Sequence, residues 1–165
     1  ATVTDISQLQ KLASELNKTY IYYGKTGRDS YKAMVSNEKN AMNARQSTFE
    51  DLLYHKISDR YQGKQNEWDL VDYIKSRNGN LKNIDAAFLP DSLKKINPEQ
   101  LLTKLLILKE RRNYLISLIR QLLPFERQDK LTAYFNSKQA ESDMIFDRQV
   151  MKVLKDEMQS DLAVN

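Results

Sequence analysis

The sequence of 165 residues is long enough for one domain with a hydrophobic core and short for two. Charged residues make up 29% of it and hydrophobic residues 41%, and the net charge of +4 is the balance of 26 basic and 22 acidic side chains. The lack of cysteine excludes disulfides, thiolate metal sites and cysteine nucleophiles, and no apolar run approaches the ~20 residues that a membrane span needs.

The first 27 residues predict a helix followed by an extended segment. In residues 5–16 apolar side chains recur at helical spacing, after an aspartate that can cap the start of a helix. Residues 19–23 are β-branched or aromatic, which favours extended backbone, and two glycines close them with a turn at 24–27. One extended segment cannot form a sheet, so we expect it either to pack on the helices or to pair with a neighbouring domain.

Residues 28–61 predict a second helical region. Phe49, Leu53 and Ile57 repeat every four residues, which indicates a buried helical face. The stretch 36–47 is mostly polar, and we expect it to be exposed.

A shorter helix and a connection follow. We expect Asn66 to cap a helix that continues through Ile74, with Asp69 in its first turn, where the helix dipole favours an acid. The Asn-Gly-Asn run at 78–80 ends this helix. Residues 81–96 predict a compact connection with one or two short turns.

The second half of the chain predicts long helices. Asn97 and Pro98 are suited to the cap and the first position of a helix. Pro124 should kink or break that helix, and a last helix is expected near residues 141–158. The apolar stripe after Pro98 contains Leu101, Leu102, Leu105, Leu106, Leu108, Leu115, Ile116, Ile119, Leu122 and Leu123.

Together these elements predict an all-α fold: an antiparallel helical bundle with long kinked C-terminal helices and a short extended N-terminal segment. The glycine-free tract after Gly79 is rich in Leu, Lys, Glu, Gln and Arg, which lose little rotamer freedom in a helix. We expect residues 1–27 to form a junction, a helix plus the Tyr-rich extended segment, and residues 28–165 to form the helical bundle domain.

No pattern predicts catalysis or metal binding, so we assign no catalytic residue, no metal ligand and no cofactor. The Gly-Lys-Thr turn at 24–26 resembles the end of a phosphate-binding loop, but Thr19 stands where that loop needs a glycine. His55 is the single histidine, and Asp51 precedes it by one helical turn. A surface pair explains these two residues better than a general base or a metal site, which needs a third ligand.

The aromatic residues around the extended segment are candidates for an interface. Tyrosine combines an apolar ring with a polar tip and is favoured where one face stays wet, as at interfaces. A partly buried cluster between helices would explain the same residues. The candidate interface residues are Tyr20, Tyr22, Tyr23, Tyr31 and Trp68.

Several runs resemble the helical region that follows the von Willebrand factor A-type domain in a group of exported bacterial proteins. The run Leu-Asn-Lys-Thr-Tyr-Ile-Tyr-Tyr-Gly at 16–24 is similar to the run after that domain, although Tyr22 replaces a proline. The pair Asn-Ala at 40–41 and the run Trp-Asp-Leu-Val-Asp at 68–72 fit later motifs, and Leu-Pro at 89–90 falls where a turn is expected. The resemblance covers residues 5–72 and is looser beyond them.

This resemblance implies a domain boundary just before residue 1, with the A-type domain on its other side. We expect the A-type domain to be the main partner, with other proteins as further partners. The A-type domain would also carry the metal-dependent adhesion motif, which residues 5–9 lack. The resemblance also implies a periplasmic, cell-envelope or exported location in a bacterium, while the composition is equally compatible with the cytosol.

Our leading hypothesis is therefore a non-enzymatic helical accessory domain that contacts the A-type domain and other proteins. One alternative is an enzyme whose site is assembled from His55 and scattered acids. Another is a helical domain that binds nucleic acid or another anionic surface, although alternating acidic and basic side chains argue against a nucleic-acid footprint. The residues of that surface would be Lys104, Lys109, Arg111, Arg112 and Arg120.

Overall fold

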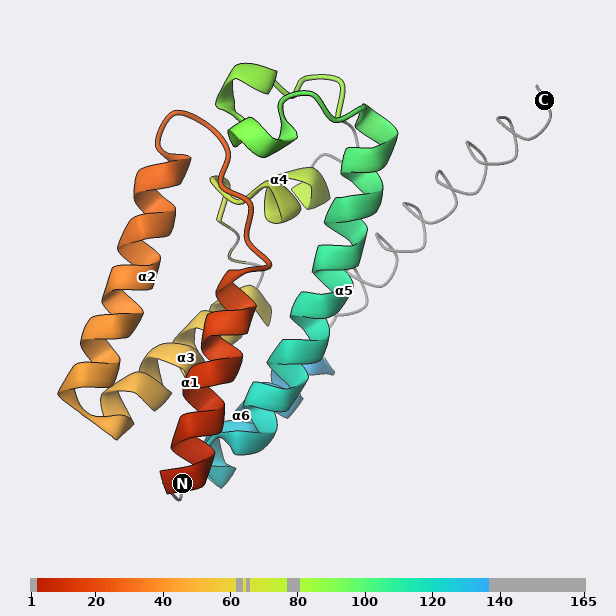
Figure 1. The fold of residues 1–165 in the computed structure, drawn as a ribbon. Helices are drawn as coiled ribbons and strands as arrows, with labels where there is room; N and C mark the ends of the chain where they lie inside the picture. The colour runs from red at the N-terminus through yellow and green to blue at the C-terminus, as the bar shows by residue number, and fades with distance from the viewer. Residues whose placement is uncertain (1–2, 62–63, 65, 77–80, 137–165) are drawn as a thin grey trace.

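The structure, a computed structural model, describes residues 3–61, 64, 66–76 and 81–136. In this part of the chain it contains six α-helices and two short 3-10 turns, and it confirms the predicted all-α helical bundle (Figure 1). The elements are α1 (Val3–Asn17), α2 (Gly27–Ala44), α3 (Gln46–Tyr61), α4 (Leu70–Ser76), η1 (Ala86–Phe88), η2 (Asp91–Leu93), α5 (Pro98–Leu122) and α6 (Phe125–Phe135). The helix expected at residues 141–158 lies outside the described residues.

The long helix α5 organises the bundle. It runs antiparallel to α1, and the two pack side by side (Figure 1). The helices α2 and α3 form a helical hairpin, and α3 also packs on α6. The short helix α4 packs on α5. No described helix has the combination of length and apolar composition that crossing a bilayer requires.

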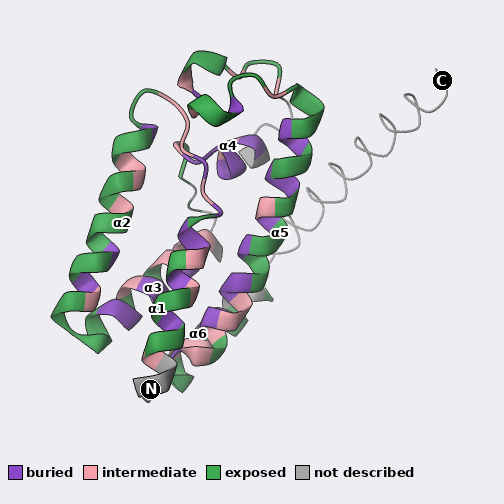
Figure 2. Ribbon diagram, in the orientation of Figure 1, coloured by how far each residue is buried: buried purple, intermediate pink, exposed green. Residues whose placement is uncertain are grey.

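Buried positions recur along α1, α4 and α5 (Figure 2). The buried apolar residues form two clusters, and α5 contributes to both. The first cluster joins α1, α3, α6 and the end of α5, and its members include Leu9, Leu16, Phe49, Leu53, Ile57, Leu115, Ile119 and Leu131. The second joins the extended segment, α4, the turn at η2 and the start of α5, and its members include Ile21, Leu70, Val71, Ile74, Leu93, Leu101 and Leu105. Because both clusters contain residues from either side of residue 27, the core is continuous across the boundary drawn from the sequence.

Both ends of α5 follow from local sequence. The Asn97 side-chain oxygen accepts a hydrogen bond from the backbone N–H of Gln100 at 2.8 Å, and Pro98 occupies the first turn, which confirms the predicted cap. At the other end α5 stops at Leu122, and α6 begins directly after Pro124. The predicted break at this proline is also confirmed.

The helical region after the Tyr-rich segment differs from the sequence prediction in two respects. It is divided into α2 and α3 at Arg45, whose backbone is extended (φ −152°, ψ 149°). The prediction that residues 36–47 are exposed is wrong for Glu38 and Ala41, which are buried. Glu38 is buried because α3 folds back and supplies Lys56 as its partner.

The start of α4 also differs. The sequence predicts a cap at Asn66, but α4 begins at Leu70. Asn66 instead accepts a turn hydrogen bond from the N–H of Asp69, and the Asp69 carboxylate accepts one from the N–H of Asp72 at 3.3 Å. Asp69 therefore occupies the capping position, three residues later than expected.

Candidate functional site

The Tyr-rich segment is fixed to residues 68–70 of the same chain. The N–H of Tyr23 donates to the carbonyl of Trp68 at 2.6 Å, and the N–H of Leu70 donates to the carbonyl of Ile21 at 2.7 Å. Tyr22 and Asp69 thereby form an isolated antiparallel bridge. Of the two possibilities left by the sequence, the segment packs on the helices and takes its backbone partners from within the chain.

A fully buried arginine holds this segment from behind. Arg112, in the middle of α5, donates from Nε to the Thr19 hydroxyl at 3.0 Å and from Nη2 to the Thr19 carbonyl at 2.9 Å. Its Nη1 donates to Asp69 at 2.8 Å and to Asp72 at 3.4 Å. Its guanidinium also lies over the ring of Tyr20, with Cζ 4.0 Å from the centroid. One side chain therefore connects α5, α4 and the Tyr-rich segment.

The charges in this network stabilise one another. Burial lowers the pKa of Arg112, but the adjacent carboxylates of Asp69 and Asp72 outweigh this effect and raise the pKa above its usual value. The guanidinium therefore stays protonated. Burial raises the pKa of Asp72, but Arg60, at 2.7 Å, and Arg112 outweigh it and lower that pKa below its usual range. Burial raises the pKa of Asp69, and Arg112 offsets this only in part. The network thus contains two cations against two carboxylates.

A second polar cluster also lies near Tyr20. The Lys56 ammonium donates to the Asn17 side-chain oxygen at 2.6 Å and to Glu38 at 2.7 Å, and Asn17 donates its amide to the same Glu38 carboxylate. Lys56 also lies 5.0 Å from the centroid of the Tyr20 ring. The ring of Tyr20 therefore contacts two positively charged side chains that are themselves held in place.

The structure brings four of the five candidate interface residues together. Tyr20 stacks on Trp68 with the ring centroids 5.8 Å apart, and Tyr31 meets Trp68 edge-on at 6.3 Å. Tyr22 lies against Tyr31 at 6.0 Å. All four are half-buried, so each keeps an accessible side. Tyr23 does not belong to this group, because its ring packs on Tyr73 instead.

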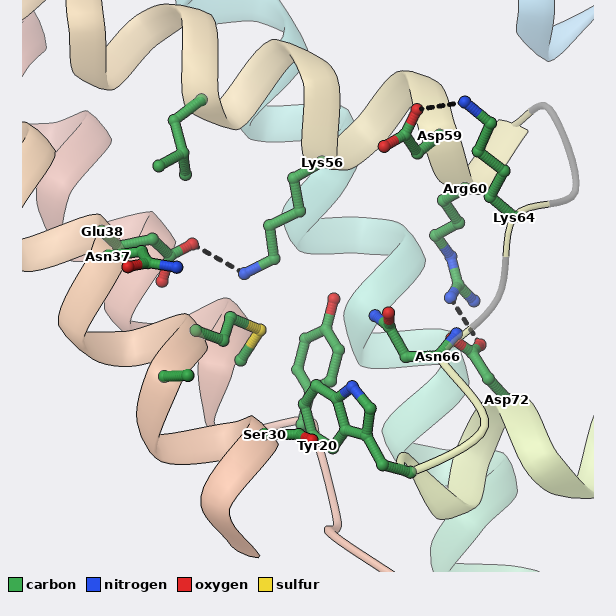
Figure 3. Close-up of a pocket in the computed structure, with 14 residues that line it drawn as sticks. Tyr20, Ser30, Asn37, Glu38, Lys56, Asp59, Arg60, Lys64, Asn66 and Asp72 are labelled. Carbon is green, nitrogen blue, oxygen red and sulfur yellow. Dashed lines mark hydrogen bonds and ion pairs between the residues drawn. The ribbon is translucent and has the colours of Figure 1, made fainter. Parts of the chain in front are cut away.

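Tyr20 and Trp68 form part of the wall of a pocket of about 520 Å³ between α2, α3 and the residues before α4 (Figure 3). Its charged side chains are paired with each other: Lys56 with Glu38 at 2.7 Å, Arg60 with Asp72 at 2.7 Å and Lys64 with Asp59 at 3.2 Å. The other lining residues are Ser30, Ala33, Met34, Asn37, Leu52 and Asn66. We call this space the paired pocket.

A second hollow of about 450 Å³ also borders Tyr20. It is lined by residues of the Tyr-rich segment, α2, the turn at η2 and α5, and we call it the lysine hollow. Its lining residues are Lys18, Tyr20, Ile21, Tyr22, Tyr31, Pro90, Ser92, Leu93, Lys104 and Leu108. Three of the four clustered aromatic residues therefore line this second space, so the aromatic group borders two concave regions.

The predicted pair of Asp51 and His55 is not what the structure contains. Asp51 forms its ion pair with Arg127 of α6, and the exposed His55 has its ring against Tyr54. The guanidinium of Arg127 provides a positive charge from another helix and pairs with the Asp51 carboxylate. Among the described residues, no three acidic or histidine side chains gather as metal ligands would.

The basic surface predicted for nucleic-acid binding included two residues that the structure shows to be buried. Arg112 is 0% exposed and Lys109 is 3% exposed, so neither is available to a nucleic acid. Arg111 is exposed but donates to Glu15 of α1 at 3.3 Å. The central role of Arg112 was missed, although a signal existed: it follows Leu108 by four residues and precedes Leu115 by three, which places it within the apolar stripe.

Comparison of the chain with models of protein families, with curated proteins and with solved structures gave no match.

Proposed function

We propose that the chain is a non-enzymatic helical domain that binds other proteins through an aromatic surface formed by Tyr20, Tyr22, Tyr31 and Trp68. The A-type domain implied by the sequence resemblance is the first candidate partner, and export from a bacterial cell is proposed on the same resemblance. The observation that carries the proposal is the half-buried aromatic group, which is held from behind by Arg112 and opens onto two concave regions.

Rigid aromatic side chains suit recognition for a physical reason. Tyrosine and tryptophan bury much apolar surface, and interfaces are enriched in them. Here Tyr20 is fixed by Arg112 and Lys56 before any partner arrives. Ordering Tyr20 on binding would therefore cost little side-chain entropy, which is one of the costs of association.

The electrostatics of the paired pocket support recognition rather than proton transfer. Glu38 and Asp72 each contact a cation at 2.7 Å, and both carboxylates are buried. For Asp72 this pairing lowers the pKa, whereas a general acid or base needs a pKa near the working pH.

The experiment is a calorimetric titration of the chain with the separately expressed A-type domain. The variant Tyr22→Ser/Trp68→Ser should weaken binding by roughly tenfold or more, since truncating central interface aromatics costs at least ~2 kcal/mol. The matched control is Tyr114→Ser, whose side chain on α5 is 60% exposed and lies apart from the aromatic surface. Equal loss in both variants, or no loss in the double variant, would count against the proposal.

A further inference from the structure

We infer that the lysine hollow binds a peptide segment in which an apolar side chain is flanked by carboxylates. This inference rests on the proposed function and specifies its ligand: a protein partner would dock an acidic, apolar segment here. The charge balance of the hollow, its apolar floor and its size support it.

The charge balance distinguishes this hollow from the paired pocket. The charged side chains among its lining residues are Lys18 and Lys104, both basic and both exposed, whereas the paired pocket has a carboxylate for each cation. Lys18 contacts Glu15 at 2.8 Å, but that carboxylate is shared with Arg111. The Glu15 carboxylate is thus shared between Lys18 and Arg111, and Lys104 adds a further positive charge. The region around the hollow therefore has an excess of positive charge.

A second acid, Asp91, does not cancel this excess. Asp91 lies between two lining residues, Pro90 and Ser92, but its side chain is 94% exposed and does not line the hollow. Its carboxylate contacts Lys94 at 2.9 Å. An incoming carboxylate therefore meets two lysines and no lining acid among the described residues.

The floor of the hollow is apolar. Ile21 and Leu93 are buried members of the second core cluster, and Leu108 packs against that cluster. Pro90 adds a further apolar surface. An apolar ligand side chain would complete this cluster, and a volume of about 450 Å³ falls within the range of sites that hold small ligands or side chains.

Tyrosine rings complete the recognition surface. The Tyr31 hydroxyl donates to the backbone carbonyl of Asn17 at 3.4 Å, so what Tyr31 offers a ligand is its ring, which lies against that of Tyr22 in the wall of the hollow. A nucleic acid is a poorer fit, because its affinity depends on several phosphate contacts and the hollow provides two lysines over an aliphatic floor.

The test is an NMR titration of the chain, in which backbone amide signals report both affinity and location. The probes are the unlabelled peptides acetyl-Gly-Asp-Leu-Phe-Glu-Gly-amide, its Asn/Gln analogue, and an acidic analogue with Ser-Ser in place of Leu-Phe. A short oligothymidylate serves as the nucleic-acid probe. We expect the acidic apolar peptide to shift amides around Ile21, Leu93 and Lys104, and to bind roughly fivefold or more tightly than either analogue.

Charge reversal localises the effect. Lys18→Glu/Lys104→Glu should abolish the preference for the acidic peptide, whereas Lys25→Glu/Lys39→Glu, at exposed positions outside the hollow, should retain it. The inference is wrong if no peptide binds, if acidic and neutral peptides bind equally, or if both charge reversals act alike. It is also wrong if oligothymidylate binds the same amides at least as tightly as the acidic peptide.

The result can be separated from that of the proposed function. If the A-type domain binds through Tyr22 and Trp68 while Lys18→Glu/Lys104→Glu leaves its affinity unchanged, the proposed function stands and the ligand assignment fails. If the aromatic variant also has no effect, both fail. If both variants weaken binding, both are supported.

Discussion

Replacing Arg112 with methionine should destabilise the fold far more than the same replacement of the adjacent Arg111. The substitution keeps an unbranched side chain of similar length but removes four hydrogen bonds, two to Thr19 and one each to Asp69 and Asp72. Asp72 would keep Arg60, but Asp69 would keep only backbone N–H donors within the described structure. Leaving one buried charge without its partner costs about 3–5 kcal/mol.

The assay is urea unfolding followed by circular dichroism and by the fluorescence of Trp68, the single tryptophan. The control is Arg111→Met, whose side chain is 52% exposed and contacts the 30% exposed Glu15, and it should lose under about 1 kcal/mol. Adding Asp69→Asn to Arg112→Met should recover part of the loss, because the uncompensated charge is gone. A loss for Arg112→Met no larger than that of Arg111→Met would refute the reasoning.

Three further measurements test the fold. Asn97→Ala should lower the free energy of unfolding by about 1 kcal/mol, and an unchanged urea midpoint would show that the cap contributes nothing. Gly24→Ala should lower the free energy of unfolding by about 1 kcal/mol, because residue 24 has a positive φ of 88° that alanine disfavours. The added methyl group itself meets no neighbour, so the backbone is the source of the cost, and a stabilised variant would contradict this. Because the pKa of Asp72 is lowered in the folded chain, its contribution is present above about pH 4 and is lost as the pH falls. In urea unfolding measured at several pH values, the difference in free energy of unfolding between the natural chain and Asp72→Asn should therefore shrink from pH 7 to about pH 3. A constant difference would show that the Asp72 carboxylate is not stabilised in the folded chain.

The features that could be predicted from sequence are those decided within a few residues. Asn97 and Pro98 begin α5 because the cap and the fixed proline φ act locally, and Pro124 ends it because proline lacks the N–H that a continuing helix needs. The periodic apolar residues of α3 and α5 are buried for the same reason: helical spacing alone places them on one face. The all-α class follows from the sum of such signals.

The features that were missed depend on partners far along the chain. Glu38 looks like a residue of a solvated helix, and only the return of α3 gives it Lys56 as a neighbour. The reversal at Arg45 has no glycine or proline to mark it. Four of the candidate interface residues could be named because aromatic character is visible in sequence, but their separation from Tyr23 depends on which ring each one meets in three dimensions.

The contact between Arg112 and Thr19 spans 93 positions of sequence, which has a consequence for how the protein is made. During synthesis, the tyrosines emerge from the ribosome long before the residue that secures them. The side chain of Arg112 can secure the segment at 19–23 only after the middle of α5 has been translated, and closing a loop of this length carries an entropic cost. A nascent chain interrupted before residue 112 would lack the side chain that holds Thr19 and Tyr20, so the proposed aromatic surface would be completed only together with the bundle.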